Sequence, residues 1–277
     1  MENSTAVRAE VRTITPTHAA IMLRANTGNR SISRGTVSKY AQMMKDRVFL
    51  MNGEPIIFNG DGTLQNGQHR LEACVQANTA FESLVVHGVS KDAFLTMDQG
   101  KKRSFADALS TQDVPNHVAA AAITRCILAM ENRGTPDTTA MSEWGKPMQW
   151  FVDRYHQDAE LIQKGVLWAA KLRYAMLVSN SSVGFSYYWA ASHDEDLAEL
   201  FFDAVHEPYG LNKRDPAMVL HMRLAKIGTA DIHRLEPIEQ CAFFIKAFSA
   251  FVRNRELGPR QLQWRRFGPT AESFPAI

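Results

Sequence analysis

Residues 60–73 constrain the fold of this chain more than any other segment, because they place a glycine-bearing loop directly before a helix. Gly60–Gly62 predicts a turn, and a very short strand centred on Leu64 follows it. Gly67 then lies in a loop that opens into a helix starting near His69. Unpaired backbone N–H groups and the helix dipole favour an anion at such a terminus, and Arg70 adds donors suited to phosphate oxygens. The alternative is an ordinary tight turn that leaves His69 and Arg70 on the surface.

Three motifs in this part of the chain resemble one known superfamily. Residues 66–73, Asn-Gly-Gln-His-Arg-Leu-Glu-Ala, are similar to the Gly-x-x-Arg box of the ParB/sulfiredoxin superfamily, where the loop holds nucleotide phosphates. Residues 11–16 and Gly28–Arg30 resemble the opening strand and the Asn-Pro-Arg-like box of that superfamily. Residues 97–104 lie where ParB proteins carry an acidic residue and an amide before an arginine. The resemblance covers about residues 10–110 and implies a stand-alone ParB-like domain of phage or mobile-element type.

This resemblance implies a nucleotide site for CTP or ATP, with Mg²⁺. Asp98 and Gln99 are the implied metal pair, because Mg²⁺ on a nucleotide is held by one or two carboxylates and by phosphate oxygens. His69 and Asp98 are the catalytic candidates, since an imidazole can act as a general acid or base near neutral pH. The interval from Asp98 to Arg103 is one residue longer than is usual in the family, which leaves open whether Lys102 or Arg103 matches the arginine of the box. The candidates for nucleotide and phosphate binding are Arg30, Asn66, Gly67, Gln68, His69, Arg70, Lys101 and Arg103.

Gln68 excludes one activity within the superfamily. Sulfiredoxins carry a cysteine between the glycine and the histidine of this box, and its thiolate performs their chemistry. A glutamine cannot replace a nucleophilic thiolate, so we do not expect sulfinic-acid reduction. Asp61 and Glu54 are the other nearby carboxylates, and we expect them to be a turn residue and a surface residue.

Composition limits the remaining functions. In the 277 residues, 45% are hydrophobic and 22% are charged, which is typical of a globular protein. The net charge of only +2 means that any surface for nucleic acid must be local. Cys74, Cys126 and Cys241 lie far apart in helix-like apolar patterns without metal-ligand spacing, which indicates a reducing compartment. No signal peptide or membrane-spanning run is apparent, so we expect a cytoplasmic protein that does not contact a membrane.

We expect an α+β architecture, with a small mixed-sheet domain over residues 1–104 and an all-α domain over residues 105–277. In the first domain the patterns predict strands over 10–14, 55–58, 63–65 and 81–89, helices over 16–25, 35–46 and 69–78, and one or two helical turns over 91–96. Beyond Phe105 nearly every segment has helical periodicity, with helices over 118–130, 159–178 and 235–256. Breaks are predicted at 134–136, 145–147, 179–184 and 207–210.

Three functions fit these features. The first is a ParB-like nucleotide-binding protein that hydrolyses the nucleotide or transfers a phosphoryl group while working with DNA. The second is a stand-alone small-molecule kinase of the free-serine-kinase type, which the same superfamily includes. The third is a non-catalytic interaction module. A homodimer is left open.

Binding to DNA would need a concentrated basic patch. Lys101, Lys102 and Arg103 form the densest patch near the implied site, and the alternative is a solvated basic turn. A further basic cluster surrounds Trp264 and consists of Arg260, Arg265 and Arg266. No convincing helix-turn-helix is present; the best candidate is the helix that contains His221, Arg223 and Lys226.

Overall fold

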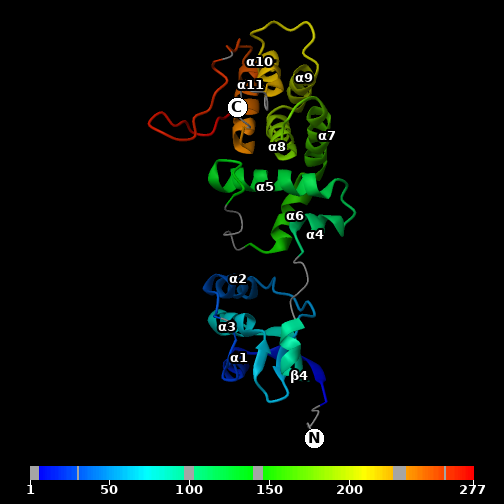
Figure 1. Cartoon of the computed structure of the whole chain (residues 1–277), viewed down its shortest axis with the longest axis vertical. Coiled ribbons are helices and arrows are strands. Elements are labelled where there is room, and N and C mark those ends of the chain that lie inside the picture. The colour runs from blue at the N-terminus through cyan, green and yellow to red at the C-terminus, as the bar shows by residue number, and fades with distance from the viewer. Residues whose placement is uncertain (1–5, 30, 97–102, 140–145, 227–234, 259) are drawn as a thin grey trace. The chain divides into compact units, whose positions relative to one another are not determined.

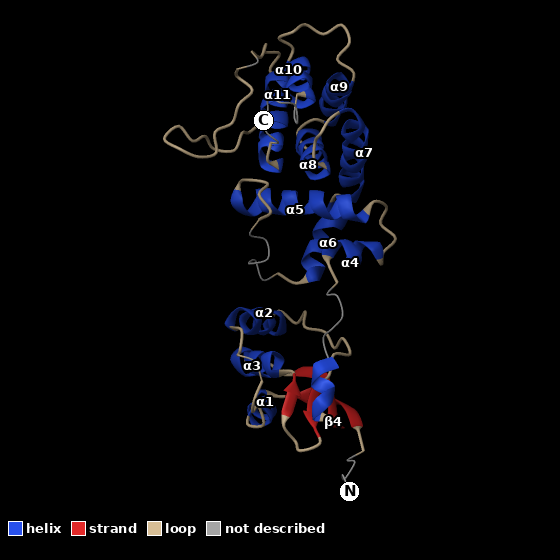
Figure 2. Cartoon of the chain, viewed as in Figure 1, coloured by secondary structure: helices blue, strands red, loops and turns tan. Residues whose placement is uncertain are grey.

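The computed structural model describes residues 6–29, 31–96, 103–139, 146–226, 235–258 and 260–277. The chain divides into two compact units, one of residues 1–102 with 145–147 and one of residues 103–144 with 148–277. The first unit combines a sheet with helices and the described part of the second is helical, so the architecture is α+β (Figure 2). Among the described helices, none has the length and the apolar run that a membrane crossing requires.

The first unit is built on a four-stranded mixed sheet with the strand order β1-β4-β2-β3. β1 (Arg8–Ile14) pairs antiparallel with β4 (Phe81–Val89), and β4 pairs parallel with β2 (Ile56–Asn59). β2 continues into an antiparallel hairpin with β3 (Leu64–Asn66). The 3-10 helix η1 (Lys91–Thr96) follows β4. All four strands and the helical turn lie close to the ranges predicted from the sequence.

Three helices share one apolar core with this sheet. They are α1 (Pro16–Leu23), α2 (Arg34–Lys45) and α3 (Gln68–Ala77), and α3 packs against both of the others (Figures 1 and 2). Ile14 and Val85 from the strands meet Val37 from α2 and Leu71 from α3 in this core. Local sequence sets the helix boundaries: Thr15 and Ser33 accept hydrogen bonds as N-caps, and Asn78 ends α3 in the left-handed conformation.

The second unit packs its helices around α8, whose side chains are mostly buried. α8 contacts α5, α7, α9 and α11 (Figure 1). A carboxylate ties three of these helices together, because Glu199 accepts hydrogen bonds from the Tyr187 hydroxyl and from Trp168 Nε1, the latter at 3.1 Å. The described helices of this unit are α4 (Phe105–Ser110), α5 (His117–Arg133), α6 (Met148–Gln157), α7 (Ala159–Ala175), α8 (Asn180–Ala191), α9 (Glu195–His206), α10 (Pro216–Ala225) and α11 (Pro237–Val252).

The break predicted over residues 179–184 is wrong, because α8 begins at Asn180 and runs through that segment. Serines and glycine are typical of loops, but here Ser179 is the N-cap and accepts a hydrogen bond from the Ser182 backbone at 3.0 Å. The Ser182 hydroxyl then donates to the Pro237 carbonyl at 2.8 Å, which joins α8 to the start of α11. Tertiary contacts therefore satisfy the polar groups that would otherwise favour a loop.

Gly184 is required by close helix packing rather than by a turn. A Cβ at this position would lie 2.2 Å from Ile123 Cδ1 and 3.1 Å from the Gly165 carbonyl oxygen. A Cβ at Gly165 would in turn lie 2.7 Å from the Gly184 carbonyl oxygen. The two glycines therefore let the backbones of α7 and α8 approach each other where no side chain fits.

We predict that Gly184→Ala destabilises the second unit by about 1–3 kcal/mol, the usual cost of overpacking a core. This clash should outweigh the gain of roughly 0.5–1 kcal/mol that alanine brings to a helix interior. Thermal and urea denaturation of the full chain measure the change. Adding Ile123→Val, which removes the closest atom, should recover part of the loss. An additive loss in the double variant would contradict the packing argument.

Candidate functional site

The β2–β3 hairpin delivers the chain to the start of α3. Asp61 Oδ1 accepts hydrogen bonds from the backbone N–H of Thr63 at 2.9 Å and from its hydroxyl at 2.6 Å. These two hydrogen bonds from Thr63 hold the pKa of Asp61 below its usual value. Asp61 is therefore a turn residue, as the Gly-Asp-Gly sequence predicted.

Gly67 occupies the position between β3 and α3 that no other residue can take without strain. Its φ of 105° is in the left-handed region, and an added Cβ would lie 2.8 Å from Ile56 Cγ1 and 3.3 Å from the Ile56 Cα. Its carbonyl accepts the backbone N–H groups of Arg70 and Leu71, both at 3.0 Å, which starts the helix. Gly67 contributes no capping side chain at this terminus, and the predicted anion site there stays a prediction.

A second loop contacts the loop that contains Gly67. Its described residues are 26–29 and 31–33. Asn26 Nδ2 donates to Gln68 Oε1 at 3.1 Å. Asn29 Nδ2 donates to the Leu64 carbonyl at 2.6 Å and to Asn26 Oδ1 at 2.7 Å. The Leu64 backbone N–H donates to the Ala25 carbonyl at 2.9 Å. The fold thus joins two motifs that are about 40 residues apart in the sequence.

His69 makes a further link between the same two loops. Its Nε2 accepts a hydrogen bond from the Ser33 backbone N–H at 3.0 Å, and Ser33 is the N-cap of α2. Because Nε2 accepts, this nitrogen carries no proton in the observed arrangement. His69 therefore connects the starts of α2 and α3, and the general acid–base role stays a prediction.

The Arg70 side chain extends toward the residues that precede β2. Its side chain is largely buried, with 8% of the residue exposed. Nη1 donates to the Glu54 carbonyl at 2.5 Å and Nη2 donates to the Pro55 carbonyl at 2.7 Å. The guanidinium thereby ties the first turn of α3 to the entry of β2. This structural role was not foreseen from the sequence, and phosphate binding by Arg70 stays a prediction.

A hollow of about 220 Å³ lies beside Arg70 in the same unit. Tyr40 and Met43 of α2 form part of its wall, and Leu50 and Asn52 of the following loop form another part. The hollow is mostly apolar, and Arg70 and Glu54 supply its charged edge.

Several expected site residues lie outside the part of the chain that the structure describes. They are Arg30, Asp98, Gln99, Lys101 and Lys102. Asn66 is described as the end of β3, where it pairs with Ile57. Arg103 is exposed and directly precedes Ser104, the N-cap of α4. From the expected set, the structure describes a consecutive group at the β3–α3 junction: Asn66, Gly67, Gln68, His69 and Arg70.

Asn26 and Ser33 were not among the predicted site residues, although both make hydrogen bonds that join the two loops. Short polar residues between two helical patterns were the available signal. That signal indicates a loop, but it does not identify the segment 40 residues away that the loop contacts.

Metal and thiol chemistry find no support among the described residues. No group of three or more His, Cys, Asp or Glu in that part of the chain could hold a metal ion. All three cysteines are buried and free, and burial raises the pKa of Cys74 to about 11 and that of Cys241 to about 12. Burial also raises the pKa of Cys126. These thiols therefore remain protonated near neutral pH, unlike nucleophilic cysteines.

The two basic regions in the second unit make contacts within the protein, which leaves them less available for DNA than the sequence suggested. In α10, His221 Nδ1 lies 2.7 Å from the Val205 carbonyl, and the Arg223 guanidinium lies 5.5 Å from the centre of the Phe243 ring. α10 is therefore an ordinary packed helix along this face. Near the C-terminus, Arg266 pairs with Asp137, and Arg265 donates to the Thr270 hydroxyl at 3.0 Å.

Comparisons with known protein families, with curated proteins and with solved structures find no match to this chain.

We predict that Gly67→Ala destabilises the first unit more than Gly62→Ala does. Both positions have a positive φ, which costs a residue with a Cβ about 1–3 kcal/mol. Only Gly67 also meets a neighbour, since an added Cβ at Gly62 has nothing within 4 Å. Thermal denaturation of the two variants separates backbone strain from the clash with Ile56. Equal losses in the two variants would mean that the Ile56 contact carries no cost.

Proposed function

We propose that the first unit binds a nucleoside triphosphate at the start of α3, as the phosphate loop of a ParB-like protein would. The observation that carries this proposal is the convergence of residues 26–33 and residues 64–70 in one polar junction. Asn26 donates to Gln68, Asn29 donates to the Leu64 carbonyl, and the Ser33 N–H donates to His69. These are the two segments that resemble consecutive boxes of that superfamily.

The chemistry of the junction supports phosphate as the ligand. α3 begins after Gly67 without a capping side chain, and the helix dipole favours negative charge at that end. Gln68 and His69 are each fixed by a side-chain hydrogen bond, so ordering them on binding costs little entropy. Phosphoryl transfer and nucleotide hydrolysis depend mainly on such positioning and on charge neutralisation.

The wider proposal is a nucleotide hydrolase or phosphotransferase that works with DNA. Mg²⁺ would be held by Asp98 and Gln99, which the resemblance implies and which lie outside the described residues. No chemical step is assigned to this ion. The DNA contact would come from Lys101, Lys102 and Arg103, because tail residues such as Arg266 are already paired within the protein.

We predict that calorimetric titration of the full chain with ATP, ADP, CTP and GTP, each with and without Mg²⁺, detects binding of at least one triphosphate. His69→Gln keeps an acceptor for the Ser33 N–H but removes the imidazole. We expect it to weaken binding by about 10-fold, the scale of one hydrogen bond to a charged group. Gln76→Ala, an exposed change near the end of α3, is the matched control and should leave affinity unchanged.

Two results would count against the proposal in different ways. If none of the four nucleotides binds to folded wild-type protein, the nucleotide site itself is wrong. If His69→Gln and Gln76→Ala bind a nucleotide as tightly as the wild type does, the ligand occupies another site and His69 does not contact it.

We predict that DNA binding weakens steeply as salt increases, with a log–log slope of about −0.9 for each phosphate neutralised. The double variant Lys101→Ala with Lys102→Ala should flatten the slope by up to about two such contacts. The control Lys45→Ala with Lys213→Ala removes the same charge from exposed positions elsewhere. Fluorescence anisotropy with a labelled duplex over a series of salt concentrations measures the slopes. Absence of DNA retention by wild-type protein even at low salt would remove DNA from the proposed function.

A further inference from the structure

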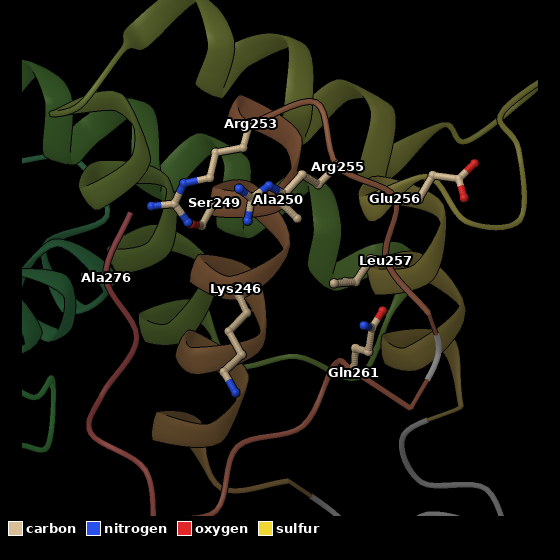
Figure 3. Close-up of a pocket in the computed structure, with 9 residues that line it drawn as sticks. All are labelled: Lys246, Ser249, Ala250, Arg253, Arg255, Glu256, Leu257, Gln261 and Ala276. Carbon is tan, nitrogen blue, oxygen red and sulfur yellow. The ribbon is translucent and has the colours of Figure 1, made fainter.

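The second unit contains a cavity of about 360 Å³ beside the C-terminal end of α11. One wall comes from α11 and its end, with Ser249, Arg253 and Arg255, and another comes from the tail, with Gln261 and Ala276 (Figure 3). This volume is in the range that small-molecule sites occupy in proteins. The cavity lies wholly in the second unit, and none of its lining residues belongs to the loops described above.

Two arginines give this cavity its charge. Arg253 and Arg255 both extend over the surface that carries Ser249 and Ala250 (Figure 3). Among the described residues, no carboxylate lies within ion-pair distance of either guanidinium. The other charged lining residues are paired: Lys246 with Glu272 at 2.5 Å, and Glu256 with Arg214 at 3.2 Å. Their side chains point away from the two arginines in Figure 3. Arg253 and Arg255 are therefore the lining cations that have no ion-pair partner among the described residues.

Both arginines are exposed, and local hydrogen bonds define the position of each. Arg253 Nη1 donates to the Ser249 hydroxyl at 2.6 Å, and Ser249 is buried with 6% of the residue exposed. Asn254 takes the left-handed conformation with a φ of 48°, and the Arg255 backbone N–H donates to the Ala250 carbonyl at 2.9 Å. This turn ends α11 and sets the backbone position from which the Arg255 side chain extends. A helix C-terminus favours a nearby cation, but that preference does not require the side chains to turn back over a cavity.

The remaining lining residues suit the rest of a small ligand. Gln261 Oε1 accepts the Gly258 backbone N–H at 2.6 Å, which leaves its amide Nε2 to donate. Ala250 and Leu257 supply apolar surface next to these donors. Two guanidinium forks match a group with about two negative charges and three acceptor oxygens, which a phosphomonoester has and a single carboxylate does not.

We propose that the cavity beside the end of α11 binds a small phosphomonoester, with its phosphate on Arg253 and Arg255 and its organic group against Ala250 and Leu257. This site is separate from the proposed nucleotide site and does not depend on it. The phosphate could also be the terminal phosphate of a nucleic acid, and the experiment distinguishes the two sources.

The experiment is a calorimetric titration of the full chain with phenyl phosphate and with inorganic phosphate. We expect wild-type protein to bind both, and phenyl phosphate more tightly because the cavity has an apolar part. Arg253→Gln and Arg255→Gln should each weaken phenyl phosphate binding at least 10-fold. Arg265→Gln removes an equal charge from an exposed arginine outside the cavity, and its affinity should stay within about twofold of the wild type.

Three outcomes would overturn the proposal. One is the absence of phenyl phosphate binding to folded wild-type protein. Another is an equal loss in Arg265→Gln, which would indicate a general charge effect. The third is binding of a 5′-phosphorylated oligonucleotide that needs Arg253 and Arg255 while phenyl phosphate does not compete, which would make the ligand a nucleic acid. His69→Gln should leave phenyl phosphate binding unchanged, so failure of the nucleotide proposal would be seen separately.

Discussion

A Cβ at Gly67 would lie 2.8 Å from the Ile56 side chain, and a Cβ at Gly184 would lie 2.2 Å from that of Ile123. Each unit therefore depends on a contact that only glycine permits. In the first unit the contact lets α3 start directly against β2, so that the residues at the start of α3 meet the loop before α2. In the second unit it lets α7 and α8 approach closely enough for α8 to lie at the centre of the helices.

The polar residues of the candidate site mainly hold the fold around it. Gln68 and His69 each receive a hydrogen bond from the loop over residues 26–33, and Arg70 donates to two backbone carbonyls before β2. A loop that is held by its own side chains presents its backbone in one conformation. Preorganisation of this kind favours binding, since fewer groups have to be ordered by the ligand. Under the nucleotide proposal, the same residues would serve both the fold and the phosphate ligand.

Clusters of basic residues in the sequence did not predict which arginines are available to bind an anion. Arg265 and Arg266 are adjacent in the sequence, yet one contacts Thr270 and the other pairs with Asp137. Arg253 and Arg255 are less prominent in the sequence, because Asn254 separates them just beyond the end of α11. In the structure they line a cavity without a carboxylate partner among the described residues. The fold brings carboxylates next to some arginines and not to others. Only the arginines without a carboxylate partner remain available to bind an anion.

By itself the sequence determined the local structure. Hydrophobic alternation over residues 81–89 predicted β4, and turn signals predicted the β2–β3 hairpin. Thr15-Pro16 predicted the start of α1, and the pattern around Tyr40 predicted α2 to within one residue at each end. It also identified Gly67 and the helix that follows it, because those signals depend on residues close together in the chain. Tertiary structure decided what each polar residue contacts: Arg70 binds the Glu54 and Pro55 carbonyls, and the serine-rich segment before Gly184 is helical. Such partners lie 15 to 55 residues away, and no local pattern specifies them, since the pairing energy exists only after the core has brought the segments together.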